Sequence, residues 1–195
     1  MGSEKVGNVH SAVHKINLPT KITLLRIVLV PPLLAFLIAP SWVNVLVAAL
    51  IFGAAALTDW LDGHLARSTH QVSTLGKLLD PIADKILLAA GLIPLVGLGR
   101  VPAWMAAILL IREFAVAGLR EIAAEQKVII SASRLAKAKT FMQILAILFL
   151  ILDVQTWPLT FHHIGLGVLT LSLVLSLVSG VDYYLKCRRM LQYRW

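Results

Sequence analysis

Four aspartates lie close together in the first half of the chain, at the ends of two apolar runs. Asp59, Asp62, Asp80 and Asp84 belong to a chain that has ten acidic residues in all. Clustered carboxylates repel one another and are costly to desolvate unless a cation offsets their charge. With oxygen ligands and no Cys/His grouping, the expected ions are hard divalent cations such as Mg²⁺ or Mn²⁺. A pair of such ions suits in-line displacement at phosphorus.

The spacing of the aspartates predicts that they form two pairs on two helix ends. Asp59, Asp62 and Ala66 share a face if one helix continues past all three, because residues three and four apart are neighbours on a helix. Asp80 and Asp84 share a face of the next helix by the same rule. Two helix ends joined by a short loop would then present the two pairs to one another.

Small residues and a proline accompany these aspartates. Gly63 and Gly76 have no side chain, so a ligand can approach the backbone there. Pro81 occupies a position suited to opening the second helix, where no N–H donor is needed. The alternative is that Gly63 ends a helix and that the aspartates are solvated loop charges or helix caps.

The composition predicts that most of the chain lies in lipid. Of the 195 residues, 58% are hydrophobic and 14% are charged, against about 25% charged in soluble domains. Six apolar runs approach the roughly 20 residues of a membrane-spanning helix, over positions 20–39, 42–65, 81–98, 102–122, 135–153 and 163–186. We therefore predict an all-α integral membrane bundle of six transmembrane helices in one domain over residues 20–190, preceded by a polar and interfacial segment over residues 1–19.

Basic residues predict how this bundle is oriented. The formal net charge is +8, and Lys and Arg gather before the first run, after the second and fourth runs, and at the C-terminus. Because cytoplasmic loops are enriched in Lys and Arg, both termini and the aspartate stretch are expected to face the cytoplasm. The apolar runs between these charges favour anionic membrane lipid over a nucleic-acid partner. The one cysteine, Cys187, is expected to be inert, with acylation as the alternative.

The aspartate stretch resembles the complete signature of the CDP-alcohol phosphotransferases. Its fixed positions are Asp59, Asp62, Gly63, Ala66, Arg67, Gly76, Asp80 and Asp84. The resemblance implies a six-helix enzyme of the bacterial inner membrane, usually a homodimer. Such an enzyme transfers a substituted phosphate from a CDP-linked donor to an alcohol and releases CMP.

The same resemblance implies roles for the individual residues. The four aspartates would bind two divalent cations, Mg²⁺ or Mn²⁺, and Asp84 would also serve as the general base for the acceptor hydroxyl. The residues that would shape the CDP-donor site are Asp62, Gly63, Ala66, Arg67 and Gly76.

Three further segments resemble bacterial phosphatidylglycerophosphate synthases. They are Asn17-Leu18-Pro19-Thr20 with Leu24-Leu25-Arg26, the stretch 112–121, and the stretch 133–143. This resemblance implies CDP-diacylglycerol as the donor and sn-glycerol 3-phosphate as the acceptor. Ala136 departs from the glycine expected before the Lys-x-Lys-Thr group. The alternative is the same chemistry with inositol phosphate, serine or phosphatidylglycerol as acceptor.

Cations in the second half of the chain are candidates for binding the phosphate of such an acceptor. Arg112 lies near the middle of the fourth run, where an unpaired guanidinium would be costly, so it needs a partner or a polar cavity. Arg120 is two turns further on nearly the same face, and Lys137 and Lys139 open the fifth run. The alternatives are a structural Arg112–Glu113 ion pair and lysines that only follow the positive-inside preference.

Other polar residues of the runs leave competing interpretations. Thr23 and Arg26 either contact a headgroup or nucleotide or extend to the membrane surface. Asp182 is expected to be a structural partner of a basic residue. A divalent-cation transporter is the competing class, but it should place acidic residues near the outer side, where Asp153 alone is found. A non-catalytic lipid-binding scaffold would lose the base, yet Asp84 is present.

Overall fold

The described residues form helices and no strand, in agreement with the all-α prediction. The structure, a computed structural model, describes residues 18–69, 74–126, 134–153 and 160–192, with side chains over 20–58, 79–126, 138–153 and 161–190. The helices are α1 Leu18–Val28, α2 Val30–Ile38, α3 Trp42–Thr69, α4 Thr74–Gly97, α5 Ala103–Glu125, α6 Arg134–Ile151 and α7 Thr160–Gln192.

The first predicted span is divided beside its two prolines. α1 and α2 meet at Leu29, and Pro31 and Pro32 lie in the first turn of α2. Proline has no N–H, so neither residue can bond to the carbonyl one turn earlier. Backbone bonds of 2.9 Å to Leu25 and 3.1 Å from Leu33 still join Leu29 to both helices. The prolines therefore interrupt the run without ending it.

The helix that carries the second aspartate pair begins earlier than predicted. The expectation that Pro81 opens it is wrong, because α4 begins at Thr74 and Pro81 lies inside it. α3 continues to Thr69, so the alternative that Gly63 ends a helix is also wrong. α1 packs against both α3 and α4. α4 continues through Pro81 although proline removes one of its hydrogen bonds.

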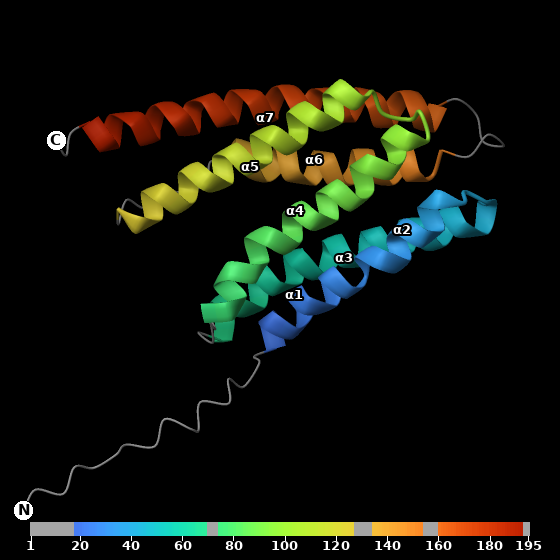
Figure 1. The fold of residues 1–195 in the computed structure, drawn as a ribbon, viewed down its shortest axis with the longest axis horizontal. Coiled ribbons are helices and arrows are strands. Elements are labelled where there is room, and N and C mark those ends of the chain that lie inside the picture. Colours follow the sequence, from blue (N-terminus) through green and yellow to red (C-terminus); the bar gives the residue numbers. More distant parts are fainter. Residues whose placement is uncertain (1–17, 70–73, 127–133, 154–159, 193–195) are drawn as a thin grey trace, which may run out of the picture.

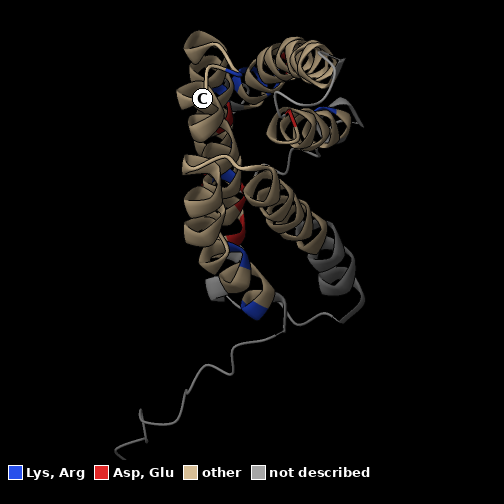
Figure 2. Ribbon diagram, turned by 90° about the vertical axis from the view of Figure 1, so that its right-hand side faces the viewer, with Lys and Arg blue, Asp and Glu red and all other residues tan. Residues whose placement is uncertain are grey.

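The helices pack in two groups that meet along α4 and where α3 contacts α6. α1, α2, α3 and α4 contact one another, while α7 packs against α5 and α6. α4 crosses between the groups and contacts α5 and α6 (Figure 1). The start of α1, the end of α3 and the start of α4 lie together at one end of the bundle (Figure 1). Figure 2 shows acidic segments next to basic ones along the helices, and ion pairs join Arg26 to Asp84 and Arg112 to Glu113.

Apolar side chains fill the interior of the bundle and also cover much of its exterior. The largest fully buried ones include Phe52, Leu95, Leu109, Ile147 and Leu150. At Gly91 of α4, a β carbon would lie 2.9 Å from Phe52 and 3.0 Å from Ile147, so glycine permits the close approach of α3, α4 and α6. Leu50 and Ile111 are exposed by 72% and 68%. An apolar exterior suits lipid as the solvent.

Two stretches of the described residues are long and apolar enough to cross a membrane, Thr20–Ile38 and Phe161–Met190. Trp42–Thr58 and Ala138–Ile151 are shorter apolar stretches. The second half of α5 carries several charged residues, which lowers its hydropathy. These features are consistent with a helical membrane protein, and the six spans and their orientation stay predictions.

Candidate functional site

Two side chains of α1 bind the two aspartates of α4. Thr23 Oγ1 donates to Asp80 Oδ1 at 2.5 Å, and Arg26 Nη1 donates to Asp84 Oδ1 at 2.5 Å. Thr23 and Arg26 are three residues apart on α1, and the aspartates are four apart on α4. Each pair therefore spans about one turn, and two hydrogen bonds join successive turns of the packed helices. Arg26 is 1% exposed, so the alternative that it extends to the membrane surface is wrong.

The donor chemistry of α4 fits a divalent cation. Asp80 and Asp84 offer carboxylate oxygens one helical turn apart, and the Asp84 side chain is 49% exposed. Among the described side chains, no third Asp, Glu, His or Cys groups with them as a metal site. Asp59 and Asp62 lie in α3, but their side chains fall outside those that the structure describes. Because only residues 70–73 separate α3 from α4, the backbone is compatible with one four-carboxylate site.

The backbone alone locates the other predicted CDP-donor residues. Gly63, Ala66 and Arg67 lie near the end of α3, and Gly76 lies in the first turn of α4. Their side-chain positions fall outside the described part of the chain, as does that of Lys137 at the start of α6. Their roles therefore stay predictions.

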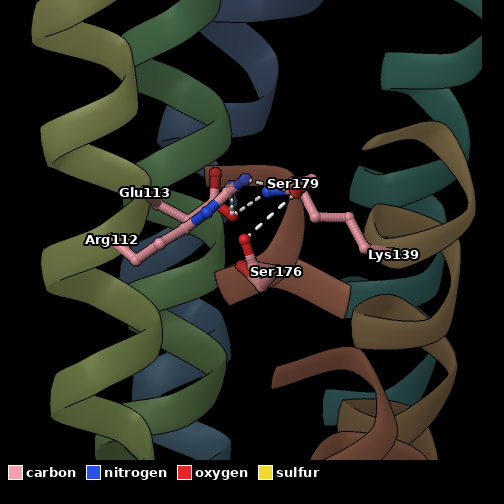
Figure 3. Close-up of polar contacts among 5 residues, drawn as sticks. All are labelled: Arg112, Glu113, Lys139, Ser176 and Ser179. Atoms are coloured by element: carbon pink, nitrogen blue, oxygen red, sulfur yellow. Dashed lines mark hydrogen bonds and ion pairs between the residues drawn. The ribbon is translucent and has the colours of Figure 1, made fainter. Parts of the chain in front are cut away.

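A second cluster of charges lies where α5, α6 and α7 meet (Figure 3). Arg112 Nη1 donates to Glu113 Oε1 at 2.8 Å, and Lys139 Nζ donates to the same oxygen. Arg112 Nη2 donates to Ser179 Oγ at 2.6 Å. Arg112 and Lys139 are 9% and 5% exposed. Two buried cations around one carboxylate leave an excess positive charge, which favours an anion.

This cluster confirms part of what the sequence predicts. The Arg112–Glu113 ion pair exists, and Lys139 joins it from α6. Arg120 is not a partner in these hydrogen bonds, and its guanidinium carbon is 5.9 Å from the ring centre of Tyr183. A phosphate-binding role for these cations is compatible with the ion pair and stays a prediction.

Lys85 is a cation of α4 whose Nζ donates to the carbonyl of Pro81 at 2.7 Å. It directly follows Asp84 on α4, and it lies within electrostatic range of the Glu113 carboxylate, as does Arg120. α4 and α5 are in contact. The aspartates and the buried cations therefore belong to neighbouring parts of one region.

Ser179 is the member of the cluster that sequence reasoning missed. It lies on one face of α7 with two other buried serines, Ser172 and Ser176, at spacings of four and three residues. This buried polar stripe on an apolar helix was the available signal. Asp182, three residues beyond Ser179, pairs with Lys186 at 2.6 Å, which confirms its expected structural role.

The described polar residues at the opposite end of the bundle make structural contacts. Arg100 Nη1 donates to the carbonyls of Leu150 and Ile151, at 3.0 Å each, and so satisfies the end of α6. Burial lowers the pKa of Arg100, and the nearby Asp153 carboxylate opposes this shift. Asp153 Oδ2 is 3.1 Å from His162 Nδ1. These contacts give Arg100 a structural role at this end of the bundle.

Comparison with known proteins identifies the class. The chain belongs to the CDP-alcohol phosphatidyltransferase family, whose sequence model matches residues 16–178. This confirms the resemblance carried by the aspartate stretch.

Individual relatives share one name, CDP-diacylglycerol--glycerol-3-phosphate 3-phosphatidyltransferase. The chain is 39% identical to that of Bacillus subtilis (strain 168) over 182 residues, covering 87% of this chain and 94% of the relative. It is 39% identical to that of Rickettsia felis over 175 residues, covering 89% and 96%. It is 36% identical to that of Shigella flexneri serotype 5b over 173 residues, covering 86% and 92%.

Proposed function

We propose that this chain transfers the phosphatidyl group of CDP-diacylglycerol to sn-glycerol 3-phosphate, giving phosphatidylglycerophosphate and CMP. The relatives named above carry this reaction in their names and align with this chain over most of their length. The observation that carries the choice of acceptor is the buried cluster of Arg112, Glu113 and Lys139. Its excess positive charge suits an acceptor that is itself a phosphate ester.

The four aspartates, Asp59, Asp62, Asp80 and Asp84, would hold two divalent cations, Mg²⁺ or Mn²⁺. When bound, such ions offset the charge that develops on the diphosphate of the donor. Thr23 and Arg26 hold the Asp80 and Asp84 carboxylates in place, as expected for partners that orient metal ligands.

Asp84 is the proposed general base. It takes the proton of the acceptor hydroxyl while that oxygen bonds to the phosphorus of the phosphatidyl group. The bond from the same phosphorus to the oxygen of CMP breaks, and CMP leaves. The bound CDP would be shaped by Gly63, Ala66, Arg67 and Gly76.

Glycerol 3-phosphate carries its phosphate and its reactive hydroxyl at opposite ends of a three-carbon chain. Arg112 and Lys139 would bind the phosphate, with Arg120 and Lys137 as further cations at the cytoplasmic side. The packing of α4, which carries Asp84, against α5, which carries Arg112, supports a short path between this phosphate and the base. Holding both ends fixes the attacking oxygen for displacement.

The proposed setting is the bacterial inner membrane, with six spans, a cytoplasmic active site and a homodimeric assembly. α1 and α2 would together form the first span. Trp42 and Trp104, at the starts of α3 and α5, are exposed by 56% and 58%, which suits an aromatic belt at the outer interface. The exposed apolar residues of α7, such as Leu171 and Val178, would face lipid or the second protomer.

Release of CMP from CDP-diacylglycerol tests this function directly. The purified chain in mixed micelles with Mg²⁺ or Mn²⁺ should release CMP with glycerol 3-phosphate. Inositol phosphate, serine and phosphatidylglycerol serve as the competing acceptors. Activity with one of these and none with glycerol 3-phosphate would refute the acceptor while keeping the reaction class.

A further inference from the structure

The side chain of Arg112 lies against α7 at Gly180, a position with no side chain. Arg112 belongs to α5, and its guanidinium reaches α7 beside Ser179 (Figure 3). A β carbon on Gly180 would lie 3.1 Å from Arg112 Nε, 3.6 Å from Cγ and 3.7 Å from Nη2. The shortest of these distances is tighter than ordinary van der Waals contact. A methyl group there would displace the arginine by a few tenths of an ångström.

The hydroxyl of Ser179, next to Gly180, is oriented to accept a hydrogen bond from Arg112. Ser179 Oγ donates its one hydrogen to the carbonyl of Ser176 at 3.1 Å. It therefore meets Arg112 Nη2, at 2.6 Å, with a lone pair. A hydrogen bond from a charged donor to a fixed acceptor holds the donor in one direction.

These contacts fix the guanidinium from two sides. Glu113 binds Nη1 from the same helix, and Ser179 binds Nη2 from α7. The stem of Arg112 passes over Gly180. An arginine is flexible, and only such a fixed arrangement presents its donors to a phosphate in a constant direction.

We propose that Ser179 and Gly180 are positioning residues for Arg112 and thereby set the affinity for the phosphate of the acceptor. This inference rests on the proposed role of Arg112 in binding glycerol 3-phosphate. It adds α7 to the helices that determine acceptor specificity, through residues that need not touch the acceptor themselves.

Gly180→Ala is the first test, with Gly167→Ala as the matched control. Both glycines lie on α7, and a β carbon at Gly167 meets no described atom within 4 Å. We expect Gly180→Ala to raise the KM for glycerol 3-phosphate about tenfold, since small misplacement of a binding group is costly. The KM for CDP-diacylglycerol and kcat should stay within about twofold, as effects on acceptor binding alone require. The control should resemble the wild type and be no less stable, because alanine is the better helix former.

The second test changes the hydroxyl without adding bulk at Gly180. Ser179→Ala should raise the same KM, and Ser179→Thr should restore it because threonine keeps the hydroxyl. These variants decide the matter if Gly180→Ala does not fold. A fall in thermal stability together with a general loss of kcat, and no selective change in this KM, would show a structural role and overturn the proposal.

Arg112→Ala separates this proposal from the proposed function. If Arg112→Ala raises the KM for glycerol 3-phosphate while Gly180→Ala and Ser179→Ala leave it unchanged, the positioning role is refuted and the acceptor role stands. If Arg112→Ala also leaves that KM unchanged, the acceptor role of Arg112 fails and this inference fails with it. Absence of CMP release with glycerol 3-phosphate in the wild type would refute the proposed function itself.

Discussion

The members of the buried charge cluster should contribute unequally to the stability of the fold. Glu113 is the shared ion-pair partner of two cations, Arg112 and Lys139, whose side chains are 9% and 6% exposed. Glu113→Gln keeps the shape and removes the carboxylate charge, so both buried cations lose their partner. Lys139→Met keeps most of the length and removes one cation, so the Arg112–Glu113 pair remains balanced. The carboxylate should therefore matter more to stability than either cation.

The expected magnitudes follow from this arrangement. Breaking a buried ion pair by removing one partner costs about 3–5 kcal/mol, so Glu113→Gln should lower the free energy of unfolding by about 3 kcal/mol. Lys139→Met should cost about 1 kcal/mol, the net value of one hydrogen bond. The difference of about 2 kcal/mol is roughly 30-fold in the folding equilibrium constant. The double variant should lose less than the sum of the two single variants, because the residues are in contact.

Reversible unfolding of the purified chain in mixed micelles measures these differences. Asp182→Asn is a suitable control, because its ion pair with Lys186 is about half exposed on both sides and should contribute about 0–1 kcal/mol. A loss for Lys139→Met that equals or exceeds the loss for Glu113→Gln would refute the charge balance described here. So would strict additivity in the double variant.

Three further outcomes are expected. Asp84→Asn should abolish CMP release while leaving a folded protein, and near-normal turnover would contradict its roles as base and metal ligand together. Removal of divalent cations with EDTA should likewise stop CMP release, and addition of Mg²⁺ or Mn²⁺ should restore it; full activity in the chelator would refute the metal requirement. Arg100→Ala should leave two carbonyls at the end of α6 without their donor and lower the free energy of unfolding by about 1–3 kcal/mol. Its kcat should stay unchanged, because its contacts are structural; a selective loss of kcat would place Arg100 in the reaction instead.

Hydropathy predicted the helices well because a long apolar run with few charges favours a buried or membrane-spanning helix. The apolar runs correspond to α1 with α2, and to α3, α4, α5, α6 and α7 in turn. The start of α4 was missed because proline is most common at the first helical position. Here Pro81 lies inside a helix that packs against α1, and the sequence of one helix does not reveal such packing.

The candidate site could be predicted only where its members lie on the same helix or on helices that follow one another in the sequence. The spacing of Asp80 and Asp84 was enough to predict their shared face. Arg112 clearly needed a partner, but Ser179 lies 67 residues away, so no local spacing links the two. The same holds for Arg26 and Asp84, which are 58 residues apart. Contacts of this range follow from helix packing, which the order of residues along one helix does not specify.

The two charge clusters have opposite signs, and this has a consequence for the order of events. The α4 aspartates would repel the phosphate of glycerol 3-phosphate until bound cations offset their charge. The cluster of Arg112, Glu113 and Lys139 attracts that phosphate through its excess positive charge. α4, which carries the aspartates, packs against α5 and α6, which carry this cluster. On the proposed function, the acceptor should therefore bind productively only after the divalent cations are in place, with its phosphate held by α5 and α6 and its hydroxyl directed toward α4.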